Sequence, residues 1–343
     1  MKSRLLGGLT AREFLRGYWQ KRPLLVRAAM PDVSGIVDRE ALAALAARDD
    51  VECRIVERRR GRREIVHGPF KTLKAKSSGW TLLVNGVNLH VAGAERLLQR
   101  FNFVPQARLD DVMVSYATPG GGVGAHVDNY DVFLLQGPGR RAWRIEKKRF
   151  VVECGDLLYL PPGARHDGVA LEPCFTYSVG FRAPRGGELA AAFLDWLHER
   201  GLPQADYRDP GLAPARRPGS IPEEMIAFAN RSLKRIRWSR SEVERFLGEY
   251  LSEPKAHVVF SPGTRRRAIA GAVVRLDPKT RMLYRGNRFF INGQALTILA
   301  RDAGPLRQLA DRRAAHGARL ARAPLAGLIL DWQRLGYVNL EKG

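Results

Sequence analysis

The sequence of 343 residues predicts an α+β protein in three parts: a helix-flanked antiparallel β-barrel or sandwich, a helical segment and a winged-helix-like unit. Three observations support this fold class. Short strands punctuated by Gly and Pro occupy residues 110 to 182, and helical periodicity lies on both sides of them. A Pro- and Gly-rich linker at 207 to 222 then precedes helices that are closed by short strands.

Helices and strands alternate ahead of the barrel. Residues 10 to 30 are expected to form an amphipathic helix with Thr10 as its N-cap, followed by the extended segment KRPLLVR. DREALAALAARDD predicts a second helix, and CRIVERR with REIVHGPF predicts a strand pair around a turn at residues 60 to 62. WTLLVNGV is typical of a buried strand, and AERLLQRFNFVP of a helix that ends at Pro105.

The barrel is expected to consist of short strands in close succession. Their sequences are DVMVSYA, HVDNYDVFLLQ, RRAWRIE, RFVVE, DLLYLP, HDGVAL and FTYSVGFR. GELAAAFLDWLHERG, EEMIAFANRSL and SRSEVERFLGEYLSE predict helices after the barrel. The C-terminal unit is expected to hold the strands AIAGAVVRL, RMLYRG and RFFING, the helices PLRQLADRRA and PLAGLILDWQRLG, and a final YVNLE.

Composition indicates a basic protein of a reducing compartment. Lys and Arg number 57 against 35 acidic residues, a net charge of +22 that favours nucleic acid or a nucleic-acid-bound protein as partner, although a generally basic proteome would give the same excess. The cysteines, Cys53, Cys154 and Cys174, form no CxxC pair, so a cytoplasmic location is expected. No apolar run reaches the length of a signal peptide or of a membrane helix, so no membrane contact is expected.

A His-x-Asp motif follows a glycine-rich run in PGGGVGAHVDNYD. Because side chains alternate along a strand, His126 and Asp128 are expected to project from the same face. His166, which opens a strand after the Pro-Pro-Gly turn of YLPPGARHDG, is the candidate third ligand. Two imidazoles and one carboxylate are the ligands of non-haem Fe(II) oxygenases, whereas zinc prefers a closed tetrahedron. His-x-Asp alone is a weak signal, because such a motif depends on its structural context.

A candidate anion-binding arginine lies on the hairpin DVFLLQGPGRRAWRIE. On its returning strand, Arg141, Trp143 and Ile145 share one face. Because a Trp is more readily accommodated inside the barrel than a pair of arginines, Arg141 is expected to point inward, where its guanidinium requires an anionic partner. The distal carboxylate of 2-oxoglutarate would meet it with two parallel hydrogen bonds. A salt bridge to an acidic residue of the core is the alternative.

From Phe14 to Pro184 the sequence resembles the bacterial JmjC-type ribosomal oxygenases, the arginine hydroxylases that act on ribosomal protein uL16. The matching stretches are FLRGYWQKRPLLVR, RLDDVMVSYATPGGGVGAHVDNYDVFLLQGPGRRAWRI, GDLLYLPPGARHDGVALEP and YSVGFRAP. The resemblance implies a JmjC/cupin-type double-stranded β-helix barrel (core about 110–183) in a domain of residues 1–186. A helical dimerisation segment at 187–257 and a winged-helix-like domain at 258–343 are expected to follow.

The resemblance also implies the cofactors and the residues that hold them. Fe(II) would be bound by His126, Asp128 and His166, with 2-oxoglutarate and O2 as cosubstrates. Arg141 would bind the 2-oxoglutarate tail, Ser178 would lie near the cosubstrate or the substrate, and Ser115 would lie near the cosubstrate.

The target arginine of uL16 is expected to enter a channel bordered by Asp111, Met113 and Tyr130. Asp111 can pair with a guanidinium, Tyr130 can stack on its plane, and Met113 can flank its aliphatic stem. The family resemblance further implies a homodimer, and the positive charge would allow non-specific contact with RNA or the ribosome.

Two other functions are compatible with these residues. One is a cupin-type metalloprotein that does not use 2-oxoglutarate, in which Arg141 is structural. The other is a basic nucleic-acid- or ribosome-binding protein with a degenerate oxygenase site, suggested by the charge and by RSLKRIRWSR.

Two details of the motif region carry expectations of their own. The family carries a longer segment where EKKRFVVEC stands here, so the rim above the site is expected to differ. The glycine run is expected to let the strand bend and to let substrate backbone approach the metal.

Overall fold

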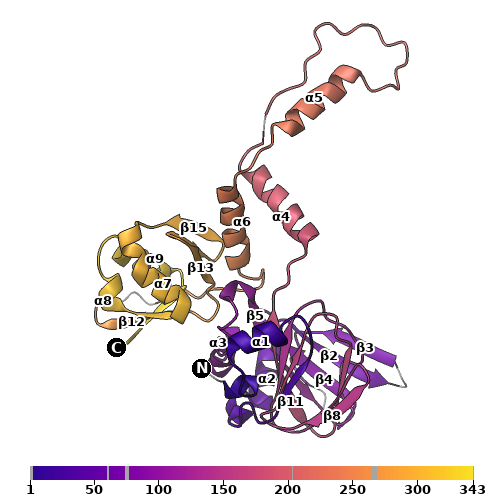
Figure 1. Cartoon of the computed structure of the whole chain (residues 1–343), viewed down its shortest axis with the longest axis vertical. Coiled ribbons are helices and arrows are strands. Elements are labelled where there is room, and N and C mark those ends of the chain that lie inside the picture. The colour runs from indigo at the N-terminus through magenta and orange to yellow at the C-terminus, as the bar shows by residue number, and fades with distance from the viewer. Residues whose placement is uncertain (1–2, 60–61, 74–76, 203, 264–268, 343) are drawn as a thin grey trace. The chain divides into compact units, whose positions relative to one another are not determined.

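The computed structural model of the chain describes residues 3–59, 62–73, 77–202, 204–263 and 269–342. Its contacts divide it into two compact units. The first comprises Met1–Ala183, Pro254–Arg281 and Arg301–Gly343, and the second comprises Pro184–Glu253 and Met282–Ala300. The barrel therefore shares a unit with two segments from the C-terminal part of the chain (Figure 1).

The larger sheet of the barrel has eight strands in the order β1-β9-β6-β11-β5-β4-β2-β3. All neighbouring strands pair antiparallel. They are β1 (Leu24–Val26), β2 (Cys53–Arg59), β3 (Arg62–His67), β4 (Trp80–Val84), β5 (Leu109–Ala117), β6 (Val132–Gln136), β9 (Leu157–Leu160) and β11 (Cys174–Phe181). Residues 60–61 of the turn expected between β2 and β3 lie outside the described residues.

The smaller sheet has three strands in the order β10-β7-β8, also antiparallel. They are β7 (Arg141–Ile145), β8 (Lys148–Val152) and β10 (His166–Ala170). Side chains of β6 and β9 pack with side chains of β7 and β8 in one buried cluster: Val132, Leu134, Trp143, Ile145, Val152, Leu158 and Leu160. The two sheets therefore enclose a common interior, and the predicted antiparallel barrel is confirmed.

The outer face of the larger sheet is covered by three helices (Figure 1). They are α1 (Ala11–Gly17), α2 (Arg39–Ala46) and α3 (Ala92–Gln99). One buried cluster joins side chains of these helices to alternate residues of the sheet, among them Phe14, Leu42, Leu97, Val112, Val114, Phe133, Tyr177 and Val179. Because side chains alternate along a strand, the residues between these point into the barrel.

The first helix is shorter than predicted. Thr10 caps it as expected, since its side chain accepts from the Glu13 N–H and the Glu13 carboxylate accepts from Thr10 in return. The helix ends at Gly17 rather than continuing toward residue 30. Gln20 has a φ of 56°, and its backbone N–H donates to the Tyr159 hydroxyl at 2.7 Å. This long-range hydrogen bond holds the chain in a conformation that a helix cannot adopt.

The C-terminal part of the first unit combines a small sheet with three helices. Its strands run in the order β16-β12-β17. The elements are β12 (Ala272–Leu276), β16 (Ala314–His316), β17 (Val338–Lys342), α7 (Ala303–Arg312), α8 (Gly317–Leu320) and α9 (Leu325–Arg334). Helices closed by short strands were predicted here, and the structure adds β16 and α8 to the expected elements.

The second unit holds the helical segment and a three-stranded antiparallel sheet in the order β13-β14-β15. Its elements are α4 (Gly186–Glu199), α5 (Glu223–Lys234), α6 (Arg240–Ser252), β13 (Met282–Arg285), β14 (Arg288–Ile291) and β15 (Gln294–Thr297). The residues described between 207 and 222 form no helix or strand, as the linker composition predicted. In the part of the chain that the structure describes, no helix is long and apolar enough to span a membrane.

A buried arginine joins the barrel to the C-terminal part of the same unit. Arg313 is 7% exposed, and its Nε lies 2.9 Å from Oε1 of Glu95 in α3. Its Nη1 and Nη2 donate to the carbonyl oxygens of Thr280 (3.0 Å) and Asp277 (2.7 Å). Burial lowers the pKa of Arg313, and Glu95 opposes that shift by stabilising the charged guanidinium.

A substitution of Phe133 tests how much core packing on the larger sheet stabilises the fold. Its fully buried ring packs on Phe14, Phe101 and Tyr159 at centroid distances of 5.4, 4.7 and 4.9 Å. Because the cavity left behind cannot fill completely, Phe133→Ala is expected to lower the free energy of unfolding by about 3–5 kcal/mol. Val151→Ala, at a position 37% exposed, is the control and should cost less than about 0.5 kcal/mol. Urea unfolding of the full chain measures both, and equal losses would contradict this view of the core.

Candidate active site

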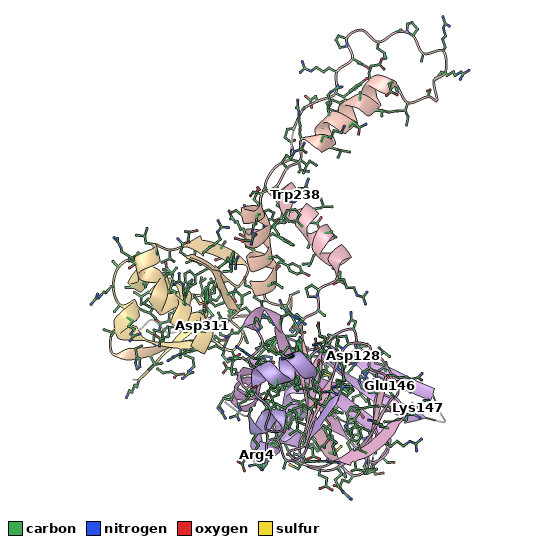
Figure 2. The ribbon with its side chains drawn as sticks, in the orientation of Figure 1. Arg4, Asp128, Glu146, Lys147, Trp238 and Asp311 are labelled. Carbon is green, nitrogen blue, oxygen red and sulfur yellow. The ribbon has the colours of Figure 1, made fainter. Side chains whose placement is uncertain are left out.

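One cavity of about 490 Å³ opens into the barrel. Every predicted site residue lines it: Asp111, Met113, Ser115, His126, Asp128, Tyr130, Arg141, His166 and Ser178. Figure 2 labels Asp128 on the β-rich part of the molecule that contains this cavity. The structure thus gathers residues from a span of nearly seventy positions at one place.

Strand alternation supplies one wall of the cavity. In β5, Asp111, Met113 and Ser115 face the cavity, whereas the residues between them belong to the helix-covered core. The register of β5 and β11 places Ser178 directly opposite Met113. Strand alternation therefore places the polar side chains of Asp111, Ser115 and Ser178 on the inner face of the larger sheet.

Three potential metal ligands converge in the cavity. His126, Asp128 and His166 each offer a ligand atom, and these atoms all lie within 4.8 Å of one another. Oδ2 of Asp128 lies 3.9 Å from Nε2 of His126 and 3.7 Å from Nε2 of His166. The centroids of the His126 and His166 rings lie 4.2 Å apart.

Backbone carbonyls orient both imidazole rings. Nδ1 of His126 lies 2.8 Å from the Gly124 oxygen, and Nδ1 of His166 lies 2.9 Å from the Ala164 oxygen. A carbonyl oxygen only accepts, so each Nδ1 carries a proton, and Nε2 is the nitrogen of each ring that remains available to a metal. Burial lowers the pKa of His166, and the nearby His126 lowers it further, which favours the neutral ring that binds a metal.

The expectation that His126 and Asp128 share one strand is wrong. The strand β6 begins only at Val132, and His126 takes part in an isolated antiparallel bridge with His166. The backbone N–H of each histidine donates to the backbone carbonyl oxygen of the other at 3.0 Å. Backbone pairing between two separate segments thus brings the two imidazoles together.

Asp131 fixes the far end of the segment that carries the ligands. Its fully buried carboxylate accepts hydrogen bonds from the Tyr159 hydroxyl at 2.6 Å, Gln20 Nε2 at 3.0 Å and Arg108 Nη2 at 3.3 Å. Its backbone oxygen accepts from the Phe181 N–H at 3.1 Å. Burial and the Asp131 carboxylate raise the pKa of Tyr159, so its hydroxyl remains a donor.

The glycine run packs against the backbone of its own chain. A Cβ added to Gly121 would lie 2.3 Å from the Trp80 carbonyl oxygen, and one added to Gly122 would lie 2.2 Å from the Gly168 oxygen. Gly124 has a φ of +80°, a conformation that L side chains rarely adopt. Gly121 and Gly122 therefore allow close contact with the chain at β4 and β10, and the contact with substrate backbone stays a prediction.

Arg141 points inward, as predicted, and is 5% exposed. Its neighbour Arg140 points outward and pairs with Glu172, with Nη2 and Oε2 3.2 Å apart. Among the described residues, neither Nε nor Nη2 of Arg141 has a hydrogen-bond partner. Unpaired buried donors on a charged group are costly, so these donors fit an anionic ligand such as a carboxylate.

Two neighbouring acidic residues, Asp110 and Asp111, line the cavity at the start of β5. The Asp111 side chain is 14% exposed, and its Oδ2 lies 2.9 Å from Nζ of Lys255. Burial raises the pKa of Asp111, and the Lys255 ammonium opposes that rise. Burial, with Asp128 and Asp111 nearby, raises the pKa of Tyr130 to about 12, so its phenol is neutral at physiological pH.

Sequence reasoning missed two residues of this region. Asp131 closes the DNYD stretch directly after the motif, and its position between the ligands and a buried strand could have indicated an anchor. Lys255 lies 144 residues beyond Asp111 in a segment without any motif, so no local signal indicated it.

Comparison with known proteins agrees with this geometry. A model of the JmjC domain matches residues 96–149 and 146–189, and a model of the ROXA-like winged helix matches residues 235–339. The chain is 35% identical over 274 residues to the ribosomal protein uL16 3-hydroxylase of Escherichia coli K12, covering 73% of either protein. It is 34% identical over 203 residues to the probable ribosomal oxygenase of Haemophilus influenzae, covering 51% of this chain and 50% of that one.

Solved structures extend the similarity over almost the whole chain. The structure of YcfD, a ribosomal oxygenase from E. coli, superposes with a TM-score of 0.83 at 31% identity, covering 97% of this chain and 98% of that one. A structure of the same enzyme in complex with cobalt and 2-oxoglutarate matches equally well, with a TM-score of 0.83. Together with the sequence identity and the geometry of the cavity, these matches establish that this chain belongs to the JmjC-type ribosomal oxygenase family.

Proposed function

We propose that this protein is a 2-oxoglutarate- and Fe(II)-dependent dioxygenase that hydroxylates an arginine of ribosomal protein uL16. The observation that carries the proposal is the combination, in one cavity, of the His126–Asp128–His166 cluster and an inward arginine with unpaired donors. The relative that acts on uL16 is 35% identical to this chain, which supports the choice of substrate.

The cluster fits a metal that keeps open positions. Two neutral imidazoles and one carboxylate form the facial set of non-haem Fe(II) oxygenases. His126 and His166 would bind through Nε2, with their Nδ1 protons held by Gly124 and Ala164. Asp128 would offset part of the positive charge. When bound, the iron supplies the oxidation of an unactivated carbon by O2 at the expense of 2-oxoglutarate.

The unpaired guanidinium fits the distal carboxylate of 2-oxoglutarate. Nε and Nη2 of Arg141 could donate two parallel hydrogen bonds to it, which would satisfy the buried donors and fix the cosubstrate's orientation. Ser115 and Ser178, which are 4% and 7% exposed, have hydroxyls on the same cavity wall and would contact the cosubstrate. This pairing distinguishes the proposal from a cupin-type protein that binds a metal alone.

The rim residues would hold the substrate arginine. Asp111 supplies the carboxylate for its guanidinium, Tyr130 a neutral ring that is 38% exposed, and Met113 a flexible thioether beside its stem. These groups would orient the side chain and exclude water from it while oxidation takes place. A ribosomal substrate would place the enzyme in the cytoplasm, and the charge of +22 would favour contact with RNA near that substrate.

Residues 187–257 are proposed as a dimerisation segment between the oxygenase domain (1–186) and the winged-helix-like domain (258–343). The helix α5, all of whose residues are described, buries none of them. Its apolar side chains remain accessible: Met225 is 43%, Ile226 43% and Leu233 66% exposed. A helix with an uncovered apolar stripe is expected to pack against a partner, here a second copy of this chain.

The ligand cluster is tested by His126→Ala, Asp128→Ala and His166→Ala. Removing one ligand weakens iron binding, so each variant is expected to lose at least about 100-fold in hydroxylation. Mass spectrometry of uL16 incubated with enzyme, iron and 2-oxoglutarate measures the gain of one oxygen, and metal analysis measures bound iron. His198→Ala, an exposed histidine of α4, is the control. Hydroxylation that survives in all three ligand variants would refute the assignment.

Arg141 is tested by comparison with its neighbour. Loss of two charge-assisted hydrogen bonds in Arg141→Met is expected to raise the KM for 2-oxoglutarate at least about 100-fold. Arg140→Met loses only an exposed pair with Glu172 and should leave that KM nearly unchanged. Steady-state succinate formation measures both. An equal change in the two variants would assign the effect to the strand instead of the inward guanidinium.

The proposed dimer is tested with Leu233→Asp. A charge on the apolar stripe of α5 is expected to shift the molecular mass in solution from two chains toward one, because burying it in an interface is costly. Light scattering after size exclusion measures that mass. Lys234→Asp, an exposed neighbour in the same helix, is the control. A wild-type protein that already runs as one chain would contradict the dimer.

A further inference from the structure

Lys255 reaches the carboxylate that would receive the substrate. It follows α6 by a few residues, and its Nζ lies 2.9 Å from Oδ2 of Asp111 and 3.5 Å from Oδ1 of Asp110. Lys255 lines the same cavity as the metal-ligand cluster. A cation of this chain thus occupies the place beside Asp111 that the substrate guanidinium would take.

Because both side chains are partly buried, this ion pair is stronger than an ordinary surface ion pair. The Asp111 side chain is 14% exposed and the Lys255 side chain 34%. Although burial acts in the opposite direction, the Asp111 and Asp110 carboxylates raise the pKa of Lys255, which therefore stays charged at neutral pH. A carboxylate that is largely removed from water needs a cationic partner, and Lys255 stabilises Asp111 while no substrate is bound.

The neighbouring acid is held by other cations. Nε of Arg182 lies 3.5 Å and Nη2 of Arg281 lies 3.6 Å from Oδ1 of Asp110. Nη2 of Arg281 also donates to the Asp110 carbonyl oxygen at 2.8 Å. Displacement of Lys255 would therefore leave Asp110 with two guanidinium partners and would free Asp111 for a new cation.

We propose that Lys255 is an internal substitute for the substrate's cationic side chain, which the substrate must displace from Asp111 in order to bind. This inference rests on the proposed function, since it takes Asp111 as the receptor of the target arginine. An ammonium is a compact charge, whereas a guanidinium presents two parallel donors to a carboxylate. Arginine gains from the exchange, while lysine only replaces one ammonium with another. Lys255 thus sets the affinity for Asp111 that a substrate side chain must exceed in order to bind there.

The test measures peptide affinity without turnover. The probe is the uL16 peptide that gains one oxygen with the wild-type enzyme, together with versions carrying lysine or alanine at the target position. Full-length protein is loaded with Zn(II) and 2-oxoglutarate without oxygen, and dissociation constants are measured by fluorescence anisotropy at pH 8. Lys255→Met and Lys255→Ala remove the internal cation, Lys255→Arg keeps it, and Lys147→Met removes an exposed lysine from the β7–β8 turn (Figure 2).

Removal of the competing cation is expected to tighten binding. Lys255→Met and Lys255→Ala should bind the arginine and lysine peptides about tenfold more tightly, a moderate gain because Lys255 is partly exposed. The alanine peptide cannot reach Asp111 and should bind all variants equally. Lys255→Arg and Lys147→Met should show no gain. Thermal unfolding of each variant shows that it is folded before its affinity is compared.

Two results would overturn the inference, and they are distinguishable from failure of the proposed function. Unchanged affinity of Lys255→Met and Lys255→Ala for the arginine peptide would show that Lys255 does not compete with substrate. Weaker binding by both would show that it supports Asp111 as a positioning residue instead. A wild-type enzyme that modifies no uL16 peptide, or prefers none with arginine over alanine, would remove the proposed function and this inference together.

Discussion

The alternation of side chains along the strands of the larger sheet is the constraint on which the site depends. Each of β5, β6 and β11 sends one set of residues into the helix-covered core and the other set into the barrel. The core set is apolar and includes Val112, Phe133 and Tyr177, while the barrel set includes Asp111, Ser115 and Ser178. A shift of one residue in any pairing would exchange the two sets, which would bury the acid under the helices and expose Phe133 to the cavity. Packing of the outer face and chemistry of the inner face are therefore fixed by the same register.

The metal-ligand cluster depends on a different kind of contact. His126 and Asp128 lie on a segment that belongs to no named strand, and this segment is held at its two ends. The reciprocal backbone hydrogen bonds between His126 and His166 fix one end, and the buried Asp131 carboxylate fixes the other. The glycines before His126 let the chain pass close to the carbonyl oxygens of Trp80 and Gly168. Backbone geometry thus brings together ligands that are separated by 40 positions, and the carbonyl partners of their Nδ1 atoms select the tautomer that a metal requires.

The sequence predicted those features that follow from local pattern. The short strands, the capped helix at Thr10, and the inward orientation of Arg141 with Trp143 all depend on periodicity or on capping chemistry, and the structure agrees with them. Local pattern could not predict the positive φ of Gln20, because this conformation accompanies a hydrogen bond to Tyr159, 139 residues away. It also could not predict Lys255, whose contact with Asp111 joins segments 144 residues apart. The strand wrongly expected at His126 shows the same limit. His126 lies outside the named strands and is held by an isolated backbone bridge to His166, a contact 40 positions away that local alternation cannot reveal.

The buried Arg313 has a consequence for truncation of the chain after the barrel. Its guanidinium meets Glu95 of α3, a helix that covers the barrel, and Lys255 and Arg281 meet Asp111 and Asp110 at the start of β5. All three cations come from the C-terminal half of the chain. A shortened version that stops after the last barrel strand would leave three carboxylates without these counter-ions, and two of them, Asp110 and Asp111, line the cavity. Genetic truncation to a minimal oxygenase would therefore alter the electrostatic potential inside its own cavity.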